Sequence, residues 1–193
     1  MRIYLMTEHA FLRVYMYYVI RVRTGKEEKT IDAIKHQLGD KDGFDVFSPF
    51  RRTQRKYNGV LKDYNERCFP GYLFVEADKP YELFKDLYWT PEFTQLLGRE
   101  GLTENFVPLN EEEERMINIL YSKNTDRITE ISNIEVREGQ IIKVLDGPLY
   151  GLLGSIKKVN LHKHLVIVEF SLCGRVVTAP LSINIITNMF DQH

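Results

Sequence analysis

The chain has few of the residues that build metal sites and disulfide frameworks. Its 193 residues include only two cysteines, Cys68 and Cys173. Neither cysteine belongs to a Cys-x-x-Cys pair or to a Cys/His spacing that is typical of zinc. Small secreted scaffolds carry more cysteines than this. We therefore expect ordinary, partly buried thiols.

Long apolar runs are also missing. The longest runs are too short to span a bilayer. The first residues include Glu8 and His9 and lack an apolar stretch followed by a small-residue cleavage site, so they are not typical of a signal peptide. We expect a cytoplasmic protein with no membrane contact.

No group of side chains predicts catalysis. His162 and His164 alternate around Lys163, but no third kind of metal ligand is spaced nearby. The chain has no glycine-rich loop of the kind that holds nucleotide phosphates. We therefore expect no metal, no cofactor and no enzymatic activity. A metal-dependent nuclease is an alternative that would need a ligand set absent from the sequence.

Charge is balanced overall but separated locally. The formal net charge is −1. Between Arg51 and Arg67 there are six Lys or Arg residues and two acids, whereas the stretch from Glu104 to Glu114 has five acids and no base. A neutral total can therefore hide separate basic and acidic surfaces.

Residues 16–121 alternate between strand and helix patterns. Ile31, Ile34 and Leu38 recur at helical spacing after Thr24, a candidate N-cap. Asn110 is placed to cap a second helix, whose first turn is acidic. Strand patterns cover the ranges 16–22, 44–50, 69–75 and 93–97, and a short helix is expected over 80–89. The order predicts an α+β sandwich, with helices on an antiparallel sheet.

A hairpin is expected within this part of the chain. Asn58-Gly59 is the strongest short hairpin signal, and it stands in the middle of the basic stretch 51–65.

The pattern changes after residue 121. Residues 122–134 are polar and are interpreted as a linker. Residues 135–188 contain only short strands and turns, which predict a small five-stranded β-barrel. The expected strands are 141–144, 154–159, 165–170, 176–179 and 183–186. Residues 1–15 are interpreted as an extension that packs poorly or that comes from an upstream start-codon assignment.

Two motifs point to a family. The run 138–156 is a strand, a turn containing Asp146-Gly147-Pro148 and further glycines, and a second strand; it resembles the KOW motif. The run Phe69-Pro70-Gly71-Tyr72 and its following strand are similar to the central strand of the NusG N-terminal domain. The order and spacing of the two motifs resemble the NusG family of transcription elongation factors over nearly the whole chain.

This resemblance implies a bacterial RNA polymerase partner. In NusG proteins an apolar patch of the N-terminal domain binds the clamp helices of the polymerase β′ subunit. By motif position the patch includes Tyr72 and Phe74, which fall two apart on one strand and so share a face. Leu97 and Tyr18 are weaker matches. The alternative, that all four are core residues, stays open.

Two basic groups are candidates for nucleic-acid contact. Arg51, Arg52, Arg55 and Lys56 stand on the expected hairpin, where they would touch non-template DNA or RNA phosphates or simply form a solvated surface. The barrel has a second set, interpreted as contacting structured nascent RNA or as a solubilising loop. The residues of this second set are Lys157, Lys158, His162, Lys163, His164 and Arg175.

Departures from the general NusG pattern favour a specialised branch. The first strand has Tyr17-Tyr18 where Trp-Tyr is usual, and Pro180 replaces the glutamate near the end of the barrel. The runs 96–101 and 107–113 most resemble the specialised LoaP-like antiterminators, which act on specific operons. We expect a monomeric antitermination factor that binds polymerase and RNA. A general NusG factor and a ribosome-associated KOW protein are the alternatives.

Overall fold

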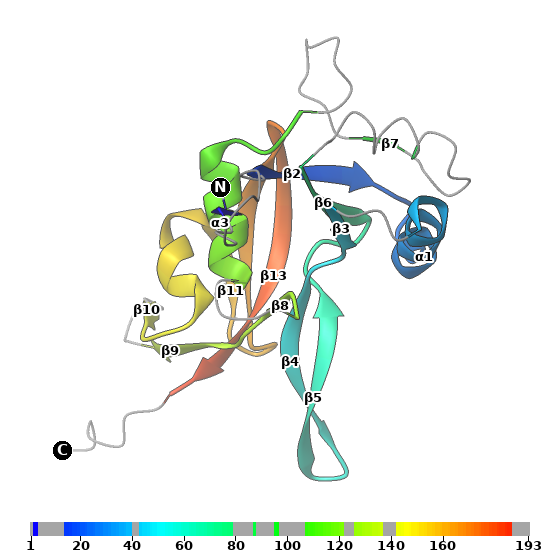
Figure 1. The fold of residues 1–193 in the computed structure, drawn as a ribbon. Helices are drawn as coiled ribbons and strands as arrows, with labels where there is room; N and C mark the ends of the chain where they lie inside the picture. Colours follow the sequence, from blue (N-terminus) through cyan, green and yellow to red (C-terminus); the bar gives the residue numbers. More distant parts are fainter. Residues whose placement is uncertain are drawn as a thin grey trace, which may run out of the picture. The chain divides into compact units, whose positions relative to one another are not determined.

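The computed structural model describes residues 2–3, 14–39, 43–78, 87, 95–96, 107–121, 126–136 and 142–186. The chain forms two compact units, each assembled from separate segments. Unit 1 comprises Met1–Ser48, Phe69–Arg115 and Ser171–Arg175, and unit 2 comprises Pro49–Cys68, Met116–Phe170 and Val176–His193. The domain boundaries expected from the sequence stay a prediction. Figure 1 shows the elements of both units.

Unit 1 is built on a five-stranded antiparallel sheet. Its strand order is β1-β2-β6-β3, and β7 pairs with β2. The strands are β1 (Arg2–Ile3), β2 (Val14–Arg21), β3 (Phe44–Phe47), β6 (Tyr72–Ala77) and β7 (Gln95–Leu96). The antiparallel sheet predicted for the N-terminal part is confirmed. Of the expected helix over 80–89, the structure describes Leu87 alone, which is helical and buried in the core cluster; most of the expected strand over 93–97 lies outside the described residues.

Helix α1 (Glu27–Leu38) covers one face of this sheet. Its buried residues Ile31, Ile34 and Leu38 form one core cluster with Tyr18, Ile20 and other strand side chains. Every third or fourth residue of α1 is apolar, so the helix buries a single stripe. The helix expected from the sequence is therefore confirmed, and it ends at Gly39 with φ 59°.

The start of α1 differs from the prediction. The N-cap is Lys26, not Thr24, and it makes no side-chain capping bond. Glu27, which is buried, instead accepts hydrogen bonds from the backbone nitrogens of Gly25 at 2.8 Å and of Gly71 at 2.7 Å. The Glu27 carboxylate thus bonds to the distant Gly71 turn as well as to Gly25, because the turn before β6 offers it a second backbone N–H. The bond joins the helix start to the Phe69-Pro70-Gly71-Tyr72 turn.

The other face of the sheet carries an aromatic cluster. Phe74 stacks on Phe47 with ring centroids 5.9 Å apart and lies 5.5 Å from Phe69. Tyr17 meets Phe47 edge-on at 6.3 Å. All four rings are buried, so this cluster is a second core of unit 1.

Helix α3 (Glu111–Tyr121) begins with the capping box that the sequence indicated. The side-chain oxygen of Asn110 accepts from the Glu113 nitrogen, and the Glu113 carboxylate accepts from the Asn110 nitrogen, both at 2.9 Å. The other Glu113 oxygen accepts from Ser171 Oγ at 3.1 Å and from the Gly174 nitrogen at 3.2 Å. One buried carboxylate thus caps the helix and holds the turn before β13.

Unit 2 contains the predicted hairpin. Strands β4 (Phe50–Tyr57) and β5 (Val60–Arg67) pair along their full length. The turn residues Asn58 and Gly59 have φ of 49° and 82°, as a two-residue turn matched to strand twist requires. Strand β8 (Ile128–Thr129) pairs with the first two residues of β4, in parallel.

A curled five-stranded sheet forms the rest of unit 2, in the order β10-β9-β13-β12-β11. The strands are β9 (Ser132–Val136), β10 (Ile142–Val144), β11 (Ile156–Asn160), β12 (Leu165–Leu172) and β13 (Arg175–Ile185). The 3-10 helix η1 (Pro148–Ser155) follows β10 where a tight turn was expected. Five strands and an all-β C-terminal part are confirmed, consistent with a KOW-like domain.

The membership of this sheet differs from the prediction at two places. The strands expected at 176–179 and 183–186 are one continuous strand, β13. The fifth strand is β9, which begins inside the segment interpreted as a linker and pairs in parallel with the end of β13. Polar residues such as Ser132 and Asn133 give no local strand signal, so only the distant pairing with β13 makes them a strand.

Candidate functional site

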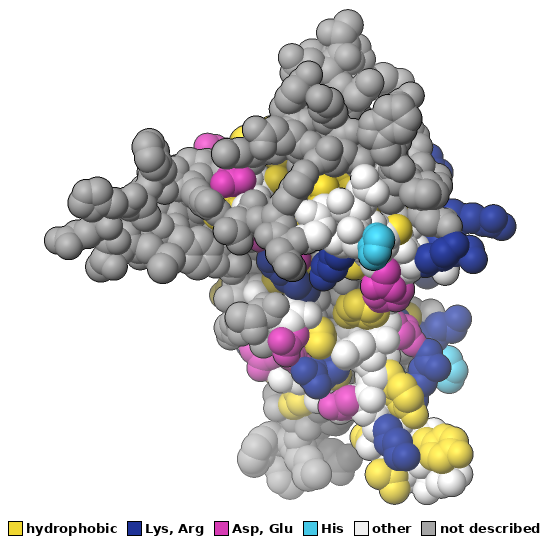
Figure 2. Space-filling view, turned by 45° about the vertical axis from the view of Figure 1, so that its right-hand side comes forward, with side chains coloured by type: hydrophobic (Ala, Val, Ile, Leu, Met, Phe, Trp, Pro, Cys, Tyr) yellow, Lys and Arg dark blue, Asp and Glu magenta, His cyan; other side chains and the backbone are white. Residues whose placement is uncertain are grey.

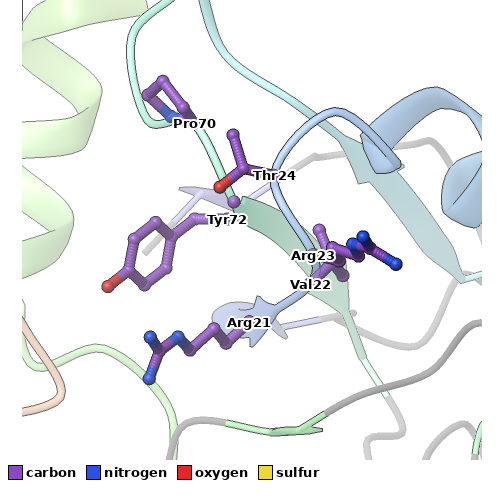
Figure 3. Close-up of a pocket in the computed structure, with 7 residues that line it drawn as sticks. Arg21, Val22, Arg23, Thr24, Pro70 and Tyr72 are labelled. Atoms are coloured by element: carbon purple, nitrogen blue, oxygen red, sulfur yellow. The ribbon is translucent and has the colours of Figure 1, made fainter.

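The turn before β6 lies beside an open pocket. The pocket has a volume of about 390 Å³, and Figure 3 shows its lining. The lining residues are Arg21, Val22, Arg23, Thr24, Pro70, Gly71 and Tyr72. Arg21 and Tyr72 are cross-strand partners and their side chains point to the same side, whereas Arg23 points away from them (Figure 3). Gly71 has φ 83°, and a Cβ there would lie 2.9 Å from Thr24 Oγ1. This turn therefore requires glycine.

The structure separates the residues that the family resemblance grouped into one patch. Tyr72 and Phe74 share a face of β6, as their spacing predicted. Tyr72 is half-buried, but Phe74 is 0% exposed inside the aromatic cluster. Tyr18 is buried on the opposite face, under α1, where burial raises the pKa of its hydroxyl to about 12. Leu97 lies outside the described residues. Among the three of these residues that the structure describes, Tyr72 alone keeps part of its side chain exposed.

The basic cluster of the hairpin is also divided. Arg51 is only 5% exposed; it donates to Ser182 Oγ at 2.6 Å and pairs with Glu66. Arg52 donates to the Glu130 carboxylate at 2.8 and 3.1 Å, and these interactions raise the pKa of its guanidinium. These two arginines hold the base of the hairpin in place. Arg55 and Lys56 are exposed farther along β4.

The cations of the C-terminal sheet lie at both ends of β12. His162, Lys163 and His164 form the exposed turn between β11 and β12, which the Asn160 side chain holds by accepting from the Lys163 nitrogen at 2.9 Å. Arg175 follows the turn at the other end of β12.

The two lysines of β11 are both exposed. Lys157 forms an ion pair with Glu169 at 2.9 Å, and Lys158 is its neighbour on the same strand. Lys158 and the turn of His162, Lys163 and His164 are therefore close together in the chain, because β11 leads directly into that turn. Arg175 lies at the opposite end of β12.

No catalytic centre emerges from the described residues. Cys68, the most deeply buried thiol here, lies 3.7 Å from Thr129 Oγ1, and burial raises its pKa to about 12. A thiol with a raised pKa is a poor nucleophile. Within the described ranges no three His, Cys, Asp or Glu side chains are grouped to hold a metal ion. None of the described helices is long and apolar enough to cross a membrane.

Comparison with known proteins decides the family. The family model described as transcription termination factor NusG matches residues 15–120. The chain belongs to the NusG family. NusG proteins are transcription factors rather than enzymes, so the expectation of no enzymatic activity is confirmed by family membership.

Named NusG relatives cover most of the chain. The transcription termination/antitermination protein NusG of Streptococcus pyogenes is 25% identical over 76% of this chain and 82% of its own. The protein of the same name from Halalkalibacterium halodurans is 26% identical over 86% and 93%, and that from Thermus thermophilus is 26% identical over 86% and 94%. A solved structure described as domain interaction in Thermotoga maritima NusG aligns with a TM-score of 0.56 and 22% identity, covering 88% of this chain and 94% of that one. This likeness supports the fold.

One set of surface residues escaped the sequence analysis of this NusG protein. Tyr57, Lys62 and Tyr64 of the hairpin are exposed in the structure, beside Arg55. Their signal was present in the sequence, because on each side of Asn58-Gly59 a tyrosine stands two positions after a basic residue. The register that places them on one face followed from the two-residue turn.

Proposed function

We propose that this NusG-family protein is an antitermination factor that binds RNA polymerase through residues 16–121 and nascent RNA through residues 135–188, with 122–134 between them. The match of the NusG family model over residues 15–120 carries this proposal. The names of the relatives, which include antitermination, support it. The altered end of the barrel, with Pro180, supports the operon-specific LoaP-like branch.

The polymerase contact is proposed at Tyr72, against the clamp helices of β′. Tyr72 is half-buried on a rigid strand, and its ring lines an open pocket with Arg21. Partly buried aromatic side chains with a polar tip are favoured at the centre of protein interfaces. Phe74, on the same face as Tyr72, and Tyr18, on the opposite face, are buried, so they belong to the core of unit 1 rather than to this contact.

A single substitution tests this contact. Tyr72→Ala is expected to weaken capture of purified RNA polymerase by about thirtyfold, the loss typical of a central aromatic side chain. Tyr150→Ala is the matched control, because Tyr150 is 67% exposed and lies in η1, outside the proposed polymerase-binding residues 16–121. Circular dichroism spectra of both variants should equal that of the parent. Unchanged polymerase capture by folded Tyr72→Ala would contradict the assigned surface.

The RNA contact is proposed at Lys158 and at the turn of His162, Lys163 and His164. These side chains are exposed, and the turn has a defined backbone conformation. Lysines that neutralise phosphates release counterions, so affinity falls as salt rises. Lys157, which pairs with Glu169, and Arg175, at the other end of β12, are proposed to add weaker contacts.

Salt-dependent binding of a structured leader RNA to the full chain tests this contact. Lys163→Gln should weaken binding and lower the slope of log affinity against log salt by about one. Lys35→Gln removes the same charge from an exposed position of α1 and is the control. Equal behaviour of the two variants would show that the turn makes no specific contact.

A general NusG factor is the second candidate, favoured by the coverage and names of the relatives. Transcription assays on two templates separate the candidates. An operon-specific antiterminator should increase read-through only on a template that encodes its leader RNA. A general factor should act equally on both templates. A ribosome-associated role would use only the KOW part and leave the region matched by the family model without a function.

A further inference from the structure

One face of the β4–β5 hairpin carries alternating tyrosines and cations. The register pairs Tyr57 with Val60, Arg55 with Lys62, and Thr53 with Tyr64. Directly paired residues of an antiparallel ladder share a face, and so do residues two apart on one strand. Arg55, Tyr57, Lys62 and Tyr64 therefore form one surface, here named the tyrosine–cation face. Lys56, Leu61, Gln54 and Asp63 belong to the opposite face.

These rings are exposed although their side chains are large. Tyr57 is 58% exposed and Tyr64 is 40% exposed. Strand β8 pairs only with Phe50 and Arg51, and within the described parts of the chain no third strand pairs with β4 beyond them. Figure 2 shows hydrophobic and basic side chains side by side at the lower right of the view, at the end of the hairpin. Rings that stay exposed to water contribute little to the stability of the fold. We therefore ask which ligand these rings could bind.

The cations lie over the rings. The Arg55 guanidinium is 5.7 Å from the centre of the Tyr64 ring, and the Lys62 ammonium is 5.0 Å from the centre of the Tyr57 ring. These distances are typical of cation–π contacts. Each cation lies over one side of its ring, and the rings as a whole stay 58% and 40% exposed, so part of each ring surface is open to a flat ligand. The two rings are four residues apart along the hairpin, about 13 Å at the rise of a strand.

Negative charge is kept away from the outer part of this face. Asp63 lies on the opposite face, where Gln54 donates to it at 3.0 Å and Arg52 approaches to 3.5 Å. Glu66 lies on the tyrosine–cation face too, nearer the base of the hairpin, where it pairs with Arg51 and Arg55. Lys62 makes no ion pair with any of the described residues. The outer hairpin therefore offers positive charge and aromatic surface together.

We propose that the tyrosine–cation face binds single-stranded nucleic acid, with bases stacked on Tyr57 and Tyr64 and phosphates held mainly by Lys62, because Arg55 is already paired with Glu66. Exposed aromatic rings beside cations are the combination that holds single strands, because every unpaired base has a flat face to stack. In a duplex those base faces are already stacked within the helix. This inference rests on the nucleic-acid role proposed for the protein and names the ligand class of its hairpin. The proposed contact residues on the hairpin therefore change. Arg51 and Arg52, which form bonds within the fold, are left out, and Tyr57, Lys62 and Tyr64 are added.

The test measures binding of the full chain to short, fluorescently labelled, unstructured oligonucleotides by anisotropy. Three probes of matched length are used: single-stranded RNA, single-stranded DNA and duplex DNA. The parent protein should bind a single strand more tightly than the duplex, and the RNA and DNA arms identify which strand it prefers. Tyr57→Leu with Tyr64→Leu, which keeps apolar surface but removes the rings, should weaken binding of the single strand at least about tenfold.

Matched variants on the opposite face make the test specific. Lys62→Gln and Lys56→Gln remove the same charge from adjacent parts of the hairpin, and Lys62→Gln should cause the larger loss. Leu61→Ala removes an exposed apolar side chain from the opposite face and should change affinity less than twofold. Melting curves that agree within error show that the variants are folded.

Three outcomes would overturn the inference. The first is that Lys62→Gln and Lys56→Gln weaken binding equally while the double tyrosine variant binds as the parent does. The second is that the parent binds the duplex more tightly than either single strand. The third is that the parent binds none of the probes at low salt. The same variants are assayed for polymerase capture. If a hairpin variant loses oligonucleotide binding but still captures polymerase, the result supports the hairpin site. If Tyr72→Ala captures polymerase as the parent does, that result overturns only the proposed polymerase contact.

Discussion

The protein has two groups of aromatic side chains that follow one another closely in the sequence and differ completely in their surroundings. Tyr57 and Tyr64 are exposed on the hairpin of unit 2, beside cations. Phe69 and Phe74 are buried in the aromatic cluster of unit 1. The change takes place at Cys68, which follows β5 directly and is buried.

The difference in burial indicates that one group of rings stabilises the fold and the other is available for binding. A buried ring stabilises the fold through its lost contact with water and its packing, whereas an exposed ring contributes little until a ligand covers it. The buried group should therefore respond to substitution with a loss of stability, and the exposed group with a loss of affinity. Three measurements sharpen or break this comparison.

The largest effect is expected at Phe74. Phe74→Ala should lower the free energy of unfolding by about 3–5 kcal/mol, because it leaves a cavity between Phe47 and Phe69. Urea denaturation measures the change, and Phe74→Leu, which fills more of the space, should lose much less. A loss under about 1 kcal/mol for Phe74→Ala would show that the cluster is not a core.

A pH-dependent effect of intermediate size is expected at Cys68. Burial raises the pKa of this thiol from its ordinary value of 9.0 to about 12. The folded protein therefore keeps the proton at a pH where the unfolded chain has released it. Its contribution is unchanged below about pH 9 and is lost as the pH rises toward about 12, by up to about 1.4 kcal/mol per pH unit.

Comparison with Cys68→Ala isolates this contribution from the other groups that titrate at high pH. The difference in unfolding free energy between the parent and the variant should shrink as the pH rises above 9. A difference that stays constant across this range would show that the thiol is open to solvent.

The smallest effect on stability is expected on the hairpin. Tyr57→Leu with Tyr64→Leu should change the free energy of unfolding by no more than about 1 kcal/mol, because both rings are exposed and only their cation–π contacts are lost. The same urea titration provides the measurement. A loss comparable to that of Phe74→Ala would remove the distinction between the two aromatic groups.

Local sequence signals predicted the elements whose cause is local. Helix α1 followed from the spacing of Ile31, Ile34 and Leu38, and the start of α3 from Asn110 and the acidic first turn. The β4–β5 register followed from Asn58-Gly59. In each case the interacting residues are separated by only a few positions, so the pattern contains all of the participants.

Signals failed where a distant partner decides the structure. Strand β9 pairs with the nearby β10 along its second half, but its first residues, Ser132 and Asn133, pair with the end of β13, about fifty residues away. Glu27 serves the Gly71 turn rather than a local cap. Alternation showed that Tyr72 and Phe74 share a face, but the aromatic cluster determines that Phe74 alone is fully buried.

The sequence by itself determined the NusG family, the α+β and all-β parts, and the hairpin that carries the tyrosines. Motif order and hydrophobic period are properties of the chain and need no coordinates. Only the tertiary structure decided which arginines remain available on the hairpin, because Arg51 and Arg52 find partners at Ser182 and Glu130, far along the chain. Burial and ion pairing depend on what packs nearby, and that is the information a linear pattern lacks.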